Sequence, residues 1–212
     1  MSKNKLKIAI TGNIGSGKSS FSKFIEEEGF TVINADDLSK IILSNDPAVK
    51  EKVIKEFGKE SYQNEKLNKT YLAEKVFSNK QNLTHLESIL HPMVINKSVE
   101  LMESFLKNKD IIFLEAALIY EADMENLFDF VILITADREL RFQRKKKSDG
   151  YTEEQFVERE NMQIPQDEKR KRADFIFENN SDLKSLKQKA KLLFILLNKP
   201  DPDKGLNLKP AD

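Results

Sequence analysis

The sequence predicts an α/β fold with three layers, in which helices cover both faces of a five-stranded parallel sheet. Three observations support this prediction. A short apolar run at residues 6–11 leads into a glycine-rich loop, a helical pattern follows the loop, and a second short apolar run follows the helix. A strand, a helix and a strand in this order form a unit whose two strands are parallel. Three later apolar runs of similar length supply the other strands.

The expected strands are short, apolar and rich in branched side chains, as is typical of strands buried on both faces. They cover residues 6–11, 30–33, 111–115, 130–135 and 174–178. The expected helices cover residues 19–28, most of 36–107, the charged stretch 138–163 with a turn at Ser148-Asp149-Gly150, and 183–197. Asp46-Pro47 predicts a helix start, whereas His91-Pro92 predicts a helix break or start.

The composition indicates a globular protein and excludes several classes of site. Of the 212 residues, 39% are hydrophobic and 33% are charged, and 35 Lys and Arg balance 35 Asp and Glu. We therefore expect no broad positive field for nucleic acid. The absence of cysteine excludes disulfides, thiolate metal sites and cysteine nucleophiles. No apolar run approaches the roughly 20 residues of a membrane helix, so we expect a cytoplasmic protein with no membrane and no obligate protein partner.

The loop after the first strand has the phosphate-loop pattern, which is a glycine, four residues and then Gly-Lys-Ser. It covers Gly12–Ser19. Glycines let backbone N–H groups surround phosphate oxygens, and the following helix directs its positive end at them. Lys18 would span the β and γ phosphates, and the Ser19 hydroxyl would bind Mg²⁺. The pattern predicts binding of ATP with Mg²⁺, by the residues Asn13, Ile14, Gly15, Ser16, Gly17, Lys18, Ser19 and Ser20.

The phosphate loop does not by itself distinguish a kinase from a GTPase or a motor ATPase. Asn198-Lys199-Pro200-Asp201 matches the guanine-reading pattern Asn-Lys-x-Asp. In a GTPase a strand precedes this pattern, but here residues 183–197 carry apolar side chains at helical spacing with lysines between them. The helical spacing therefore counts against guanine recognition.

Acidic residues follow or end two of the expected strands. Asp36 and Asp37 come after the second strand, and Glu115 ends the third. The carboxyl ends of strands in an open parallel sheet face the ligand crevice. One aspartate could therefore orient an acceptor hydroxyl and take its proton, and Glu115 could hold Mg²⁺ through a water. The alternatives are an acidic helix N-terminus for the aspartates and a solvated strand end for Glu115.

Over about residues 5–197 the chain resembles the dephospho-CoA kinase family, because five segments match that family in order. The phosphate loop is generic, but the His-Pro pair and a late series of residues are specific. The five segments are Thr11–Ser19, for Thr-Gly-Gly-Ile-Gly-Ser-Gly-Lys-Ser; Asn34-Ala35-Asp36, for Asp-Ala-Asp; Leu90-His91-Pro92, for Leu-His-Pro; Ala117-Leu118-Ile119-Tyr120-Glu121, for Pro-Leu-Leu and a glutamate; and Gln163, Lys169, Ala173-Asp174 and Asn179.

The resemblance implies transfer of the ATP γ-phosphate to the 3′-hydroxyl of the ribose of dephospho-CoA, the final step of coenzyme A synthesis. It implies a single P-loop kinase domain at 1–200, with a core at about 1–36, 108–137 and 164–198, a CoA-binding helical part at about 37–107 and a lid at about 138–163. The tail 199–212, with three prolines from Lys199 on, is expected to be disordered.

With the resemblance, each candidate residue receives an expected role. Asp36 is expected to be the catalytic base, aided by Lys18 and Arg144. Ser19 is expected to bind the metal directly, and Glu115 through a water. The residues expected to bind substrate are Thr11, Asp36, His91 and Glu121.

Three departures from the family pattern bear on these expectations. Asn34 replaces the first aspartate, and Ala117 replaces a proline. The family lid has two arginines four residues apart; Arg144 matches the first, but Ser148 stands at the second. The lysines at 145–147 could supply charge there, although lysine lacks the planar fork of arginine. The alternative is that these lysines form an ordinary solvated helix face.

Two other functions remain open on the sequence. The chain could be a kinase of another small acceptor, such as a nucleotide or shikimate, or a nucleotide-dependent switch or binding module without an acceptor. His91 could be a catalytic base, but beside a proline and in a helical setting we favour a role in shaping the CoA-binding part or contacting substrate. A metal role is disfavoured, because the chain has two histidines and no cysteine.

Overall fold

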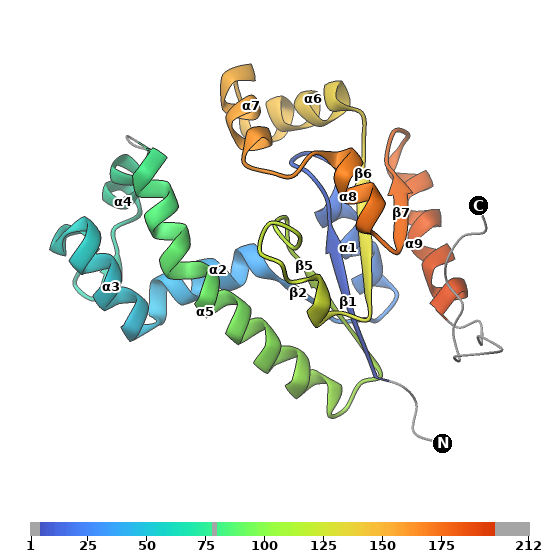
Figure 1. Cartoon of the computed structure of the whole chain (residues 1–212), viewed down its shortest axis with the longest axis horizontal. Coiled ribbons are helices and arrows are strands. Elements are labelled where there is room, and N and C mark those ends of the chain that lie inside the picture. Colours follow the sequence, from blue (N-terminus) through green and yellow to red (C-terminus); the bar gives the residue numbers. More distant parts are fainter. Residues whose placement is uncertain (1–4, 78–79, 198–212) are drawn as a thin grey trace. The chain divides into compact units, whose positions relative to one another are not determined.

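The computed structural model describes residues 5–77 and 80–197, and Figure 1 traces the chain through them. These residues form two compact units. The first contains the described residues up to Ile33 together with those from Leu106 onward, and the second contains Asn34–Phe105. The expected disordered tail and the Asn-Lys-x-Asp pattern lie outside the described residues. In the described part of the chain, no helix is long and apolar enough to cross a membrane.

The first unit is built on a five-stranded sheet with the strand order β2-β5-β1-β6-β7. β1 pairs in parallel with β5 on one side and with β6 on the other, and β6 pairs in parallel with β7. The predicted α/β fold class with a parallel sheet is therefore confirmed. The strands are β1 Leu6–Thr11, β2 Val32–Asn34, β5 Ile111–Glu115, β6 Phe130–Thr135 and β7 Phe175–Glu178.

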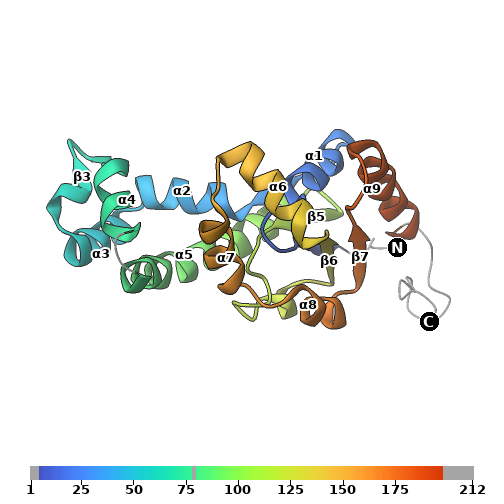
Figure 2. The same ribbon diagram turned by 90° about the horizontal axis from the view of Figure 1, so that it is seen from above.

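Two helices cover one face of this sheet, α1 (Lys18–Glu27) and α9 (Leu183–Leu197). Both carry apolar residues at helical spacing, and those residues are buried with the inward side chains of the strands. The rings of Phe21 on α1 and Phe177 on β7 stack with centroids 5.3 Å apart. In Figure 2 the helix α8 (Gln166–Arg172) lies on the opposite side of the sheet from α1 and α9.

The stretch predicted to be charged and helical forms two helices, α6 (Arg138–Asp149) and α7 (Glu153–Asn161). Gly150 ends α6 in the left-handed conformation, with φ 71°. Thr152 then begins α7 with a capping box that includes Gln155. The rings of Phe142 and Phe156 meet between the two helices, with centroids 5.5 Å apart. The turn predicted at Ser148-Asp149-Gly150 is therefore present, and apolar contact joins the helices on either side.

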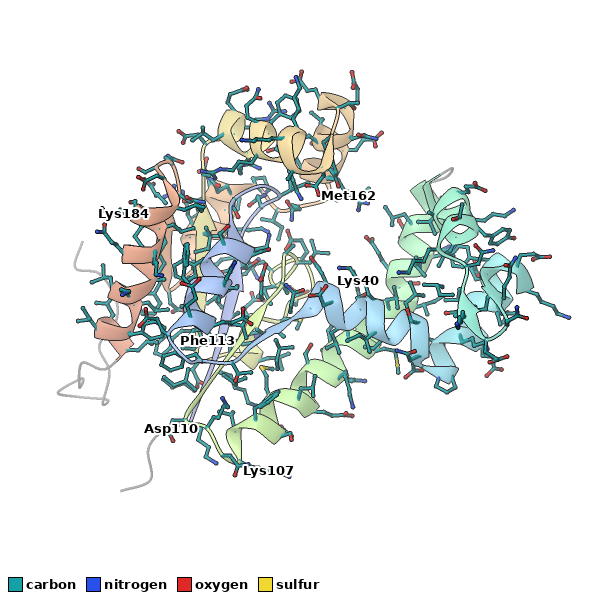
Figure 3. The ribbon with its side chains drawn as sticks, turned by 180° about the vertical axis from the view of Figure 1, so that it is seen from behind. Lys40, Lys107, Asp110, Phe113, Met162 and Lys184 are labelled. Carbon is teal, nitrogen blue, oxygen red and sulfur yellow. The ribbon has the colours of Figure 1, made fainter. Side chains whose placement is uncertain are left out.

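The second unit is mainly helical, as the sequence predicts. Asn34 and Asp46 cap α2 and α3, and Pro47 occupies the first turn of α3. In Figure 3, Lys107 and Asp110 mark the turn that leads from α5 to β5. The elements of this unit are α2 Ala35–Asn45, α3 Pro47–Phe57, the 3-10 turn η1 Lys59–Ser61, β3 Tyr62–Gln63, β4 Lys66–Leu67, α4 Lys69–Phe77 and α5 Lys80–Leu106, whose last residue belongs to the first unit.

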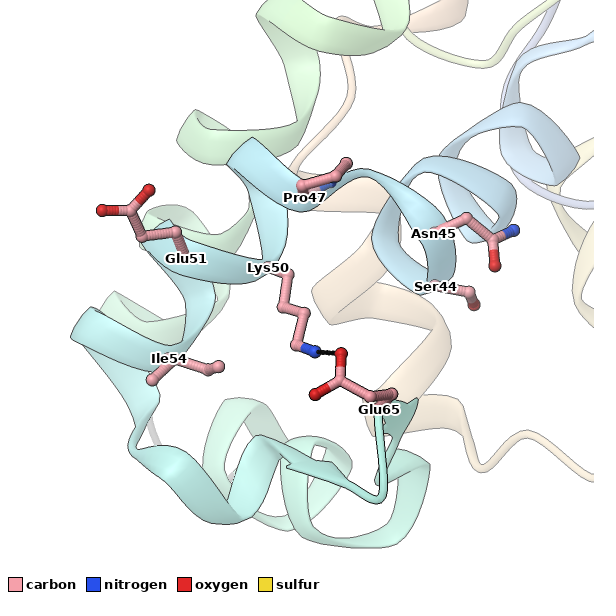
Figure 4. Close-up of a pocket in the computed structure, with 7 residues that line it drawn as sticks. All are labelled: Ser44, Asn45, Pro47, Lys50, Glu51, Ile54 and Glu65. Carbon is pink, nitrogen blue, oxygen red and sulfur yellow. Dashed lines mark hydrogen bonds and ion pairs between the residues drawn. The ribbon is translucent and has the colours of Figure 1, made fainter.

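Two features of the second unit differ from the sequence predictions. A small antiparallel hairpin, β3 with β4, occurs where we expected no strand. Its two-residue turn is formed by Asn64 and Glu65, both with positive φ. Glu65 pairs with Lys50, and both residues line a surface hollow of about 490 Å³ (Figure 4). The hollow is lined by Ser44, Asn45, Pro47, Lys50, Glu51, Ile54 and Glu65.

The second difference is that α5 runs through Pro92 instead of ending or starting there. Proline has no N–H, so the carbonyl four residues earlier, that of Ser88, loses its helical partner. Ser88 and Pro92 are both exposed, and water can therefore bond this carbonyl. Exposure thus lowers the cost of a proline inside the helix, and the prediction of a helix boundary at His91-Pro92 was wrong.

Candidate active site

The phosphate loop lies between β1 and α1, so it has the strand before it and the helix after it that its motif requires. Two of its glycines are also required by their surroundings. Gly15 has φ 77°, and a Cβ there would lie 2.4 Å from the backbone oxygen of Arg141. Gly17 has φ 99°, and a Cβ there would lie 2.2 Å from Nδ2 of Asn179. Both the backbone conformation and the close packing exclude a larger residue.

Two oxygen groups meet at the start of α1. The Ser19 hydroxyl donates to Oε1 of Glu115 at 2.8 Å. Glu115 is only 5% exposed and ends β5, the strand beside β1. A hydroxyl and a carboxylate are ligands that Mg²⁺ accepts. No cluster of three His, Cys, Asp or Glu that could hold a metal occurs among the described residues, so a magnesium ion here would need phosphate and water oxygens as well.

Residues from the late part of the chain hold the phosphate loop in place. Oε1 of Gln163 accepts the Ile14 N–H at 2.8 Å, and Nδ2 of Asn13 donates to the Ile164 oxygen at 3.1 Å. Nδ2 of Asn179 donates to the Ser16 oxygen at 2.8 Å. Gln163 and Asn179 belong to the late series that carries the family resemblance. Their contacts give both residues a task, which is to fix the loop backbone.

Arg144 reaches the phosphate loop from α6. Its Nη2 donates to the Asn179 oxygen at 2.7 Å, and its Nη1 donates to the Gly15 oxygen at 3.5 Å. Burial lowers the pKa of Arg144, but a guanidinium keeps its charge at neutral pH. Sequence reasoning missed Arg141, which lies three residues earlier on the same helix face and donates to the Ile14 oxygen at 3.3 Å. The spacing of the two arginines is the signal that could have revealed Arg141.

The lysines after Arg144 differ in their surroundings. Lys145 donates to Asp149 at 2.8 Å, and its Nζ lies 5.6 Å from the ring centroid of Tyr151. The Ser148 hydroxyl donates to the same Asp149 carboxylate at 2.6 Å. The side chains at 146 and 147 are exposed. The charge of Lys145 is therefore balanced within α6, which makes this lysine the least suited to replace a second lid arginine.

Two residues expected to bind substrate have protein partners in the first unit. Thr11 is fully buried, and its hydroxyl donates to the Ala117 oxygen at 3.4 Å. Oε1 of Glu121 accepts both the Lys169 ammonium and the Ile164 N–H at 2.8 Å. Burial lowers the pKa of the fully buried Lys169, and its bond to Glu121 opposes this shift in part. Oε2 of Glu121 is buried with no hydrogen-bond partner among the described residues.

Asp36 and His91 belong to the second unit. Asp36 and Asp37 lie in the first turn of α2, but Asn34 is its N-cap and accepts the Asp37 N–H at 3.0 Å. Lys40, labelled in Figure 3, donates to Asp37 at 2.7 Å, whereas Asp36 is exposed. His91 is half-buried on α5. The acidic first turn is thus present without an aspartate as the cap, and the catalytic role of Asp36 and the substrate role of His91 stay predictions.

Known proteins resemble this chain over most of its length. Residues 6–185 match the dephospho-CoA kinase family. A dephospho-CoA kinase of Protochlamydia amoebophila is 36% identical over 194 residues, which cover 89% of this chain and 94% of the relative. The solved dephospho-CoA kinase from Campylobacter jejuni is 30% identical, with a TM-score of 0.69 over 90% of this chain and 96% of its own. A shikimate kinase from Acinetobacter baumannii shares the fold, with a TM-score of 0.57 over 94% of this chain and 97% of its own, but is only 16% identical.

The family match covers most of the chain, and it includes both the phosphate loop and the late residues that hold it. The similarity to shikimate kinase is one of fold alone, so it gives no support to the alternative acceptor. The chain therefore belongs to the dephospho-CoA kinase family, which catalyses the final step of coenzyme A synthesis, the ATP-dependent phosphorylation of dephospho-CoA.

Proposed function

We propose that the phosphate loop of the first unit binds Mg²⁺ and ATP, and that Asp36 serves as the base when the γ-phosphoryl group moves to the 3′-hydroxyl of dephospho-CoA. The observation that carries this proposal is the contact between the Ser19 hydroxyl and the buried Glu115 carboxylate. It joins two oxygen groups at the helix N-terminus that follows a phosphate loop. A metal bound with ATP would add positive charge beside this buried carboxylate.

The chain's own groups would neutralise the charge of the phosphates. Loop N–H groups and the N-terminus of α1 attract phosphate oxygens, and Lys18, the first residue of α1, would bring a positive charge to them. Arg144 now donates to two neutral carbonyls. Charged phosphate oxygens are stronger acceptors than carbonyls, so Arg144 would exchange its partners when ATP binds. Bound Mg²⁺ would add Lewis-acid polarisation of the phosphate oxygens.

The proposed acceptor-side roles follow from the family pattern described above. Asp36 would orient the acceptor hydroxyl and take its proton. We propose that Thr11, His91 and Glu121 bind dephospho-CoA. We expect the enzyme to act in the cytoplasm without a nucleic-acid or obligate protein partner.

A coupled assay of ADP release tests this function. Purified protein is given ATP and Mg²⁺ with dephospho-CoA, with shikimate or nucleoside monophosphates, or with no acceptor. We expect ADP release to require dephospho-CoA and to stop when EDTA removes Mg²⁺. Lys18→Ala should lower kcat at least tenfold, which is ~1.4 kcal/mol of barrier, with little change in thermal stability.

The other functions predict different outcomes in the same assay. A nucleotide switch would release ADP slowly and with no response to any acceptor. A kinase for another acceptor would respond to shikimate or a nucleotide at least as well as to dephospho-CoA. Product analysis by mass spectrometry and NMR locates the new phosphate, and a phosphate at any position other than the 3′-hydroxyl would contradict the proposal.

A further inference from the structure

The segment formed by α6 and α7 contains a partly buried ion pair that the proposed mechanism does not use, between Arg141 of α6 and Glu160 of α7. Nη2 of Arg141 donates to Oε1 of Glu160 at 2.5 Å. The Arg141 side chain is 6% exposed and that of Glu160 is 22% exposed. A buried guanidinium is tolerated only when acceptors and a counter-charge surround it. Glu160 supplies that counter-charge from the neighbouring helix.

The other donors of Arg141 are also occupied by protein atoms. Nε donates to the Ala136 oxygen at 3.2 Å, just after β6, and Nη1 donates to the Ile14 oxygen at 3.3 Å in the phosphate loop. The guanidinium also lies over the ring of Phe156, 5.6 Å from its centroid. Unlike Arg144, whose hydrogen-bond partners are carbonyls, Arg141 is bound to a carboxylate and is 6% exposed, so we expect it to keep its protein partners. It joins the end of β6, the phosphate loop and α7.

The position of Arg141 determines the position of Arg144 relative to the phosphate loop. A Cβ added to Gly15 would lie only 2.4 Å from the backbone oxygen of Arg141. This turn of α6 therefore packs directly on the phosphate loop. Arg144 follows three residues later on the same helix face and reaches the oxygens of Gly15 and Asn179. A shift of α6 away from the loop would therefore remove Arg144 from it as well.

Glu160 serves a second arginine of α6, and this gives an internal comparison. Its Oε2 accepts from Nε of Arg138 at 2.9 Å. The Arg138 side chain is 46% exposed, against 6% for Arg141. Exposed ion pairs contribute little, whereas loss of one partner of a buried pair leaves an uncompensated charge. The two arginines thus share a carboxylate, but only one of them contacts the phosphate loop.

We propose that Arg141 and Glu160, which we name the arginine clamp, position Arg144 for phosphoryl transfer by holding α6 on the phosphate loop. Neither clamp residue touches the phosphates; both act through Arg144. The proposal rests on the phosphate-binding role proposed above for Arg144. The clamp predicts that Arg144 is useful only while Arg141 is bound to Glu160.

A double-mutant cycle tests the arginine clamp. We expect Arg144→Ala to lower kcat/KM for ATP about tenfold or more in the wild-type background, but less than about threefold in the Arg141→Met background, because α6 has already left the loop. Glu160→Gln, which keeps the size and loses the charge, should behave like Arg141→Met. Arg138→Met and Glu158→Gln, an exposed change on α7, should leave kcat/KM within about twofold of wild type.

Other outcomes would overturn the clamp. A purely structural pair would lower Tm while the folded variants kept wild-type kcat/KM and the full effect of Arg144→Ala. If Arg144→Ala does not change kcat/KM in the wild-type background, Arg144 has no role for the clamp to support, and the proposal is wrong. Should Arg141→Met not fold, Arg141→Lys and Glu160→Gln complete the cycle. If no acceptor stimulates ADP release, the proposed function fails. The clamp is then tested by calorimetric ATP affinity, in which the effect of Arg144→Ala should again be smaller in the Arg141→Met background than in wild type.

Discussion

Asn34 performs a local task that does not need the charge of an aspartate. Its Oδ1 accepts the Asp37 N–H and caps α2, and asparagine and aspartate cap helices about equally well. The departure from the family pattern at this position therefore removes one negative charge and keeps the helix start. Asp36 and Asp37 remain in the first turn, where the helix dipole favours carboxylates. Position in the helix alone does not separate their roles.

The neighbours of the two aspartates do separate them, and they lead to a prediction. Asp37 is occupied by Lys40 and is exposed, so Asp37→Asn should be mild. Asp36→Asn should lower kcat on the order of 10²–10⁴-fold, the range of general-base catalysis, because an amide cannot take the hydroxyl proton. Steady-state kinetics give kcat, and calorimetry should show nearly unchanged ATP affinity in both variants.

The stability of the same variants is the control for this prediction. Asparagine fits the first turn of a helix, so both variants should unfold within a few degrees of wild type. Equal losses of kcat at the two positions would argue against Asp36 as the base. A loss of ATP affinity confined to Asp36→Asn would assign that residue to nucleotide binding.

At the scale of elements, the basic side chains of α6 have two kinds of partner. Arg144 contacts the phosphate loop, and Lys145 pairs with Asp149 one turn further on. We expect Arg144→Ala to cost about 2–4 kcal/mol in kcat/KM, by analogy with lost oxyanion donors. Single changes to alanine at 145, 146 and 147 should each cost less, because lysine acts as a point charge. Kinetics at several ATP concentrations measure all four variants.

Ser148→Arg completes the test of this helix. An increase in activity would mean that no other cation performs the task of the second family arginine. A neutral result, with one lysine variant as damaging as Arg144→Ala, would mean that this lysine performs it. If none of the changes matters, α6 is not a phosphate-gripping lid and its proposed role is wrong.

The elements that the sequence predicted correctly are those with strong periodicity and clear end signals. Residues 6–11, 111–115 and 183–197 form a strand, a strand and a helix with those bounds. The hairpin at 62–67 was missed because its strands have two residues each, too few for a period. α5 was divided wrongly because a proline signal is local, whereas the helix is stabilised by its burial elsewhere, as at Met102.

At the scale of the whole molecule, the candidate site was only partly predictable. Lys18 and Ser19 follow from a local motif, because the loop and the helix that position them are adjacent in sequence. Gln163 was singled out only by resemblance, and Arg141 with Glu160 was missed. These contacts join segments that are distant in sequence, and they depend on how α6, α7 and the residues after α7 pack. No local sequence pattern encodes that packing.

The buried pair of Glu121 and Lys169 also connects distant segments. Glu121 follows β5, and Lys169 lies on α8. Glu121 contacts the segment after α7, whereas Lys169 contacts the segment after β5. Lys169 donates to the Ala117 oxygen at 3.3 Å, and Glu121 accepts the Ile164 N–H at 2.8 Å. Ile164 in turn accepts from Asn13 of the phosphate loop. Loss of this pair should therefore affect the stability of the whole first unit.

Single removal of either charge should destabilise the fold strongly. Glu121→Gln keeps an acceptor for the Ile164 N–H, and Lys169→Met keeps most of the buried length, so each mainly removes one charge. Each should cost about 3–5 kcal/mol of unfolding free energy, which is roughly 6–20 °C in Tm. The double variant has no buried unpaired charge and should cost clearly less than the sum of the two single variants.

Urea unfolding followed by circular dichroism measures the unfolding free energy of all three variants. Lys171→Met, an exposed change on α8, is the control and should cost less than about 1 kcal/mol. Strict additivity of the two single changes would show that Glu121 and Lys169 are not coupled, and their ion pair would then not be what joins these segments.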